Sequence, residues 1–81
     1  MEQYLILARS VTYAQRMQRA LERAGIRSQI ARAPRDLTDL GCAYVVRVTE
    51  LAPALRVIHK EGLGPAQVFL YQRGFYQEVR P

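Results

Sequence analysis

Residues 4–25 read YLILARSVTYAQRMQRALERAG, an apolar run followed directly by an amphipathic segment. The run over 4–8 is typical of a buried strand. Ser10 is a residue type preferred at helix N-caps, and the apolar positions after it recur every three or four residues, as on one helix face. Those positions are Val11, Ala14, Met17, Leu21 and Ala24. Because Gly25 favours the left-handed conformation that ends many helices, this stretch predicts a strand over 4–8 and a helix over 11–24.

The rest of the chain continues with short strands and one more helix. Residues 26–32 alternate between apolar and polar side chains, as in a half-buried strand. Pro34 breaks this strand, and residues 33–41, which carry Asp, Thr and Gly, predict a loop. Residues 42–48 are rich in valine and tyrosine, which favours a third strand. Thr49 is a candidate cap for a second helix that carries Pro53 in its first turn and ends at Gly62. Residues 66–72 predict a fourth strand, and 75–79 a short extension or edge hairpin.

This order of elements predicts a ferredoxin-like α+β fold. Strand, helix, strand, strand, helix, strand is the split βαβ arrangement, with a four-stranded antiparallel sheet and two helices on one face. A chain of 81 residues with 49% hydrophobic side chains is long enough for one small domain over 1–81. It has little room for a deep substrate cleft, so we expect a carrier or binding protein rather than a stand-alone enzyme.

Composition excludes several classes of site. The chain has one cysteine and one histidine, Cys42 and His59, so it cannot close an internal disulfide or supply a Cys/His zinc cluster. No cofactor motif is present, and we predict neither a metal nor an organic cofactor. A single thiol fits a reducing compartment, so we expect a cytoplasmic protein. No apolar window approaches the roughly 20 residues of a membrane span. The net charge of +5 comes from scattered arginines, not from a basic tail.

The expected topology brings Cys42 to a specific place. If the third strand begins near Cys42 and pairs with the first, the cysteine lies beside the start of the helix over 11–24. A helix N-terminus carries about half a positive charge, which stabilises a thiolate and lowers the pKa of a cysteine. Ser10 and Thr12 are candidate hydroxyl donors, and Arg35 in the loop is a candidate cation. Arg47 is a further candidate, although about 16 Å of extended strand separates it from Cys42. The alternative interpretation is that Cys42 is a small apolar filler.

Four short motifs resemble those of a known family, the small bacterial putative selenium/sulfur carrier-like proteins. They are Ser10 opening a helix, LERAGI at 21–26, PRDL at 34–37 and CAYVVR at 42–47. The likeness covers 1–72 and implies that Cys42 is the covalent carrier of a persulfide-type sulfur or selenium, exchanged with donor and acceptor proteins. One position departs from the family pattern: Ala43 stands where the family has glycine.

The central strands are apolar on both sides, whereas helices are expected on only one. An open apolar face of this kind marks a partner surface, so we expect a homodimer through the sheet face or the edge near 75–79. A non-catalytic module that binds a protein or an anionic ligand, with Cys42 as filler, is the alternative function. Nucleic-acid binding is a weaker third, because the third strand lacks the aromatic pattern of RNA-recognition motifs. Its candidate stacking residues are Tyr4, Tyr71, Phe75 and Tyr76.

Overall fold

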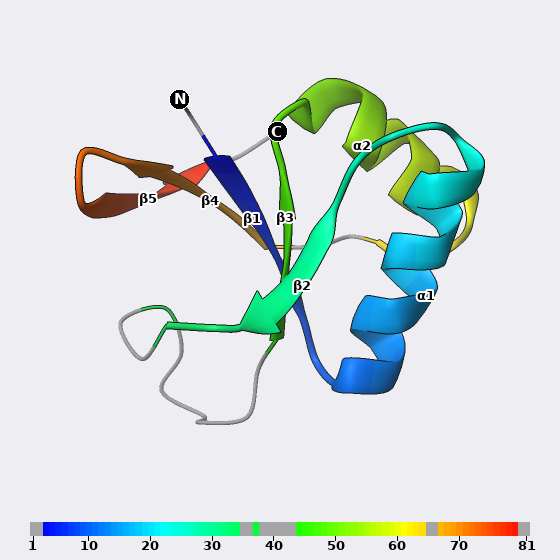
Figure 1. Cartoon of the computed structure of the whole chain (residues 1–81), viewed down its shortest axis with the longest axis horizontal. Helices are drawn as coiled ribbons and strands as arrows, with labels where there is room; N and C mark the ends of the chain where they lie inside the picture. Colours follow the sequence, from blue (N-terminus) through cyan, green and yellow to red (C-terminus); the bar gives the residue numbers. More distant parts are fainter. Residues whose placement is uncertain (1–2, 35–36, 38–43, 65–66, 80–81) are drawn as a thin grey trace.

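The computed structural model describes residues 3–34, 37, 44–64 and 67–79, and within these residues the chain forms five strands and two helices (Figure 1). In chain order they are β1 (Gln3–Ala8), α1 (Val11–Arg23), β2 (Gln29–Arg32), β3 (Tyr44–Val48), α2 (Leu51–Lys60), β4 (Val68–Gln72) and β5 (Phe75–Val79). The first six elements follow the predicted order. The predicted count of four strands is wrong, because residues 75–79 form a fifth strand.

All five strands belong to one sheet in the order β2-β3-β1-β4-β5, and every neighbouring pair is antiparallel. β1 lies in the middle, paired with β3 on one side and β4 on the other. Both helices lie on the same side of the sheet (Figure 1). β5 joins through a tight hairpin, in which Gln72 pairs with Phe75 across Arg73 and Gly74. The sequence predicts either a short extension or an edge hairpin here, because a pattern over five residues cannot distinguish a strand from irregular structure.

Local hydrogen bonds fix the limits of both helices. Ser10 caps α1, since its Oγ accepts the Tyr13 N–H at 3.1 Å. Each helix ends with a glycine at positive φ, Gly25 at 77° and Gly62 at 72°. In each case the next residue, Ile26 or Leu63, donates its N–H back to a carbonyl five residues earlier at 2.9 Å. This paired glycine and apolar residue is the Schellman ending that the sequence predicts at Gly25.

The cap predicted for α2 is wrong. Glu50, not Thr49, occupies the N-cap position of α2, and it makes no side-chain cap hydrogen bond. The helix begins at Leu51, so Pro53 falls in its first turn, as predicted. This turn tolerates proline because its N–H groups have no acceptor in a preceding turn.

The core lies between the helices and one face of the sheet. It is built from alternate strand residues and one stripe from each helix. Its fully buried members include Ile6, Met17, Leu21, Val46, Ile58 and Val68. Leu5 and Val45 point to the opposite face by this alternation, yet they are only 4% and 1% exposed. The open apolar face is therefore narrower than the sequence suggests.

β2 begins three residues later than predicted, at Gln29 instead of Ile26. The backbone before it bonds to α1 rather than to β3. Ile26 donates its N–H to the Leu21 carbonyl, and the Ser28 carbonyl accepts the Gln18 amide at 3.3 Å. Residues 26–28 thus leave the edge of the sheet, and this departure shapes the groove described below.

Candidate functional site

The end of β1 and the start of β3 lie side by side where α1 begins. In the antiparallel register Ala8 pairs with Tyr44, and Ser10 follows Ala8 by two residues. Figure 1 shows β1 leading directly into α1 at this end of the sheet. Cys42 and Arg35, two of the predicted site residues, lie outside the described residues, as does Ala43. The described part of the predicted site is therefore Ser10, Thr12 and Arg47, and β3 begins at Tyr44.

The N-terminus of α1 favours the approach of a negatively charged group. Ser10 Oγ accepts the Tyr13 N–H, and the Ser10 carbonyl accepts the Ala14 N–H at 2.9 Å. The amides of Val11 and Thr12 come earlier in the helix, where no intrahelical acceptor exists. The first turn carries no acidic side chain to offset the positive end of the helix dipole. Val11 and Thr12 are both exposed, so this end of the helix is accessible.

A cation next to this helix start was missed from sequence. The Arg9 guanidinium carbon lies 5.0 Å from the centre of the Tyr13 ring, in the range of a cation–π contact. The Tyr13 hydroxyl in turn donates to the Leu63 carbonyl at 3.0 Å, which ties the ring to the end of α2. Arg9 immediately precedes the cap residue Ser10, and this position next to a predicted helix start could have identified it from the sequence.

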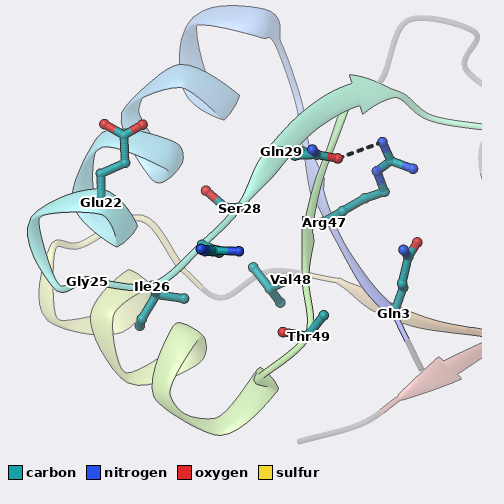
Figure 2. A pocket seen from close by; sticks show the side chains of 10 residues that line it. Gln3, Glu22, Gly25, Ile26, Ser28, Gln29, Arg47, Val48 and Thr49 are labelled. Carbon is teal, nitrogen blue, oxygen red and sulfur yellow. Dashed lines mark hydrogen bonds between the residues drawn. The ribbon is translucent and has the colours of Figure 1, made fainter. Parts of the chain in front are cut away.

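Arg47 lies farther along β3, away from the start of α1. Its register partners are Leu5 in β1 and Gln29 in β2, and its Nη2 donates to Gln29 Oε1 at 3.0 Å (Figure 2). Leu5 precedes Ala8 by three residues in β1, so roughly 10 Å of strand separate Arg47 from the end of β1 at about 3.4 Å per residue. The structure thus brings Ser10 and Thr12 together but places Arg47 apart from them.

Arg47 instead lines an open groove at the start of β2, with a volume of about 630 Å³ (Figure 2). The walls come from the last turn of α1, residues 25–29, the end of β3, and Gln3 of β1. No sequence motif pointed to this groove, because its residues come from three separate parts of the chain.

The candidate stacking residues do not share one surface. Tyr4 packs against the core on the helix side, whereas Tyr71 and Tyr76 contact each other on the opposite face with ring centres 4.9 Å apart. On the face of β1 and β3 that points away from the helices, the described residues contribute no aromatic side chain. They are Gln3, Leu5, Leu7, Val45 and Arg47. The first and third strands therefore lack the platform on which RNA-recognition motifs stack bases.

The described part of the chain contains neither a metal-binding cluster nor a membrane-spanning helix. There, no three His, Cys, Asp or Glu side chains lie close enough to hold a metal ion. None of the helices in these ranges is long and apolar enough to cross a membrane.

Comparison with known families gives the decisive match. A family model described as putative Se/S carrier protein-like matches residues 3–70, which is most of the chain. The chain belongs to this family. The match confirms the resemblance drawn from Ser10, LERAGI, PRDL and CAYVVR. Cys42 falls inside the segment shared with the Se/S carrier-like family, whereas β5 falls beyond it. Searches of curated proteins and of solved structures found no match.

Proposed function

We propose that this chain carries sulfur or selenium as a persulfide-type species on Cys42, within a ferredoxin-like domain extended by β5. The observation that supports the proposal is the register between Ala8 and Tyr44. Because of this register, β3 begins at the same end of the sheet as α1, where the amides of Val11 and Thr12 have no intrahelical acceptor. Membership of the Se/S carrier-like family supports the same role.

The transfer reaction requires Cys42 to be a thiolate and requires nearby positive charge to stabilise it. The Cys42 thiolate attacks the outer sulfur of a donor persulfide, the donor's S–S bond breaks, and the donor leaves as a thiolate. Cys42 then holds the sulfur as a persulfide, with no net oxidation or reduction. A thiolate on the acceptor then attacks the same outer sulfur. The bond between that sulfur and Cys42 breaks, and Cys42 leaves as a thiolate. Sulfur-bound anions at Cys42 would be stabilised by the α1 dipole and by Arg9, with Arg35 and the hydroxyls of Ser10 and Thr12 as further donors.

Mass spectrometry tests the carrier role directly. After incubation with a small-molecule persulfide donor, we expect the intact chain to gain about 32 Da, removable by a reductant, as for a persulfidated cysteine. The Cys42→Ser variant should gain nothing. An unmodified Cys42 under conditions that convert free cysteine would overturn the proposal.

The rate of thiol alkylation against pH tests the electrostatic part. We expect Cys42 to titrate below the free-cysteine pKa of about 8.5. Arg9→Gln removes a positive charge, which destabilises the thiolate, so the pKa should rise and alkylation at neutral pH should slow. Arg16→Gln is the matched control, because Arg16 is also exposed on the N-terminal half of α1 but lies in its second turn. Equal effects of the two variants would remove Arg9 from the site.

The alternative function is a non-catalytic binding module in which Cys42 is an apolar filler. The groove beside Arg47 favours an anionic ligand for such a module. A Cys42 pKa at or above the free value, or a thiol that reagents reach only on unfolding, would support this module over the carrier.

A further inference from the structure

The groove at the start of β2 contains two buried polar atoms without partners. Ser28 Oγ and Arg47 Nε are both fully shielded from solvent, and neither has a hydrogen-bond partner among the residues that the structure describes. Such atoms are uncommon in folded proteins, because desolvation without a compensating hydrogen bond costs about 1–3 kcal/mol. Their occurrence together in one groove is typical of a site whose ligand or ordered water completes the hydrogen bonds.

The side chains next to these atoms present donors. A guanidinium can only donate, so the Gln29 atom 3.0 Å from Arg47 Nη2 must be the amide oxygen. The Gln29 NH₂ group, with two donor hydrogens, is therefore left for another acceptor. Figure 2 shows Arg47 and Gln29 turned toward each other, with Ser28 on the segment that leads into β2. The contact also holds the Arg47 guanidinium in place, which reduces the entropy lost when it binds a ligand.

The charge of the groove also favours an anion. Arg27 and Arg47 line it, against one carboxylate, Glu22. Among the described residues, the only ion pair is Arg23 with Glu61, so no carboxylate there neutralises Arg47. A planar guanidinium beside amide and hydroxyl donors is the arrangement that recognises carboxylate or phosphate oxygens.

We propose that this groove binds the carboxylate or phosphate group of a small molecule. Arg47 and Gln29 hold the anionic oxygens from β3 and β2, and Arg27 adds charge at the rim. The volume of about 630 Å³ fits a small organic molecule. The site is independent of the carrier proposal, since it lies at the opposite end of β1 from Ser10.

Titration of the full chain followed by amide NMR tests this inference. The probes are inorganic phosphate and acetate, each against sodium chloride at equal ionic strength. We expect shifts centred on residues 26–29 and 47–49 with millimolar or tighter binding, and the stronger probe identifies the anionic group. Arg47→Gln should weaken binding at least tenfold, as expected for a charged hydrogen bond. Cys42→Ser should leave it unchanged, which separates this site from the carrier.

Controls distinguish a built site from general attraction to a basic protein. Arg16→Gln makes the same change in net charge outside the groove and should leave binding unchanged within a factor of two. Gln29→Ala removes an exposed amide with little risk to folding and should weaken binding several-fold, even if Arg47→Gln fails to fold. Shifts spread over many arginines, or equal losses in the Arg16 and Gln29 variants, would overturn the proposal.

Discussion

Two serines show how the same side chain has different energetic effects at two places in this fold. Ser10 Oγ accepts the Tyr13 N–H at 3.1 Å and so satisfies a donor at the start of α1. Ser28 Oγ is buried in the groove and has no hydrogen-bond partner in the described part of the chain. A satisfied cap stabilises its helix, whereas an unsatisfied buried hydroxyl lowers stability by the cost of its desolvation.

Alanine substitution should separate these two effects. We expect Ser10→Ala to lower the free energy of unfolding by about 1 kcal/mol, because the cap is lost. Ser28→Ala should leave it unchanged or raise it, because no hydrogen bond within the protein is broken. Urea denaturation followed by circular dichroism measures both. An equal loss in both variants would mean that a bound water already satisfies Ser28 in the free protein.

The β4–β5 hairpin contains the one non-glycine residue at positive φ among those described. Arg73 has φ of 52° and Gly74 of 82°, and they form the two-residue connection between Gln72 and Phe75. Two consecutive residues at positive φ are typical of a type I′ turn, in which asparagine followed by glycine is preferred. Arginine at the first position is therefore strained.

Replacement of this arginine should stabilise the hairpin. We expect Arg73→Asn to raise the free energy of unfolding by about 0.5–1 kcal/mol, because asparagine tolerates the left-handed region better. Thermal and urea unfolding measure the gain. Gly74→Ala is the counterpart and should lower stability, since alanine is disfavoured at φ of 82°. A neutral Arg73→Asn would show that the arginine side chain makes a compensating contact.

Sequence patterns predicted the limits of α1 better than the start of β2. The three- and four-residue spacing of Ala14, Met17 and Leu21 predicted α1 to within one residue of its end, because burial on one helix face leaves a periodic signal. Alternation over 26–32 placed β2 too early, since it cannot show that Ile26 bonds back to α1.

The candidate site was predicted only in part, for a related reason. Ser10 was predictable as a cap because its partner is three residues away. The contact between Arg47 and Gln29 spans 18 residues and depends on the strand register, so no local pattern indicates the groove. The place of Cys42 stays a prediction.

At the scale of the whole molecule, the two edges of the sheet differ. β2 forms one edge and β5 the other. β2 ends in the exposed Arg32, a charged residue of the kind that discourages pairing between edges. The β5 edge begins with Phe75, whose side chain is 76% exposed. The Glu78 carboxylate of β5 accepts a hydrogen bond from Gln67 at 3.1 Å. An exposed aromatic on an open strand is costly for an isolated chain and favours a partner.

The choice between the two homodimer surfaces expected from sequence follows from burial. Leu5 and Val45, at the centre of the sheet face, are already covered within the monomer, which leaves less apolar area there for a partner. We therefore predict that a second copy pairs through β5, antiparallel across a twofold axis, so that both Phe75 side chains are buried.

Light scattering after size exclusion tests this dimer. We expect a mass near twice the 9.3 kDa of one chain. Phe75→Ser should shift the chain toward monomer because it removes the apolar surface that the partner buries. Val11→Ser is the matched control: Val11 is also an exposed apolar residue, at 42%, but it lies on α1, and its loss should leave the dimer intact. A monomeric parent chain would refute the prediction, and a dimer that survives Phe75→Ser would move the interface to the sheet face.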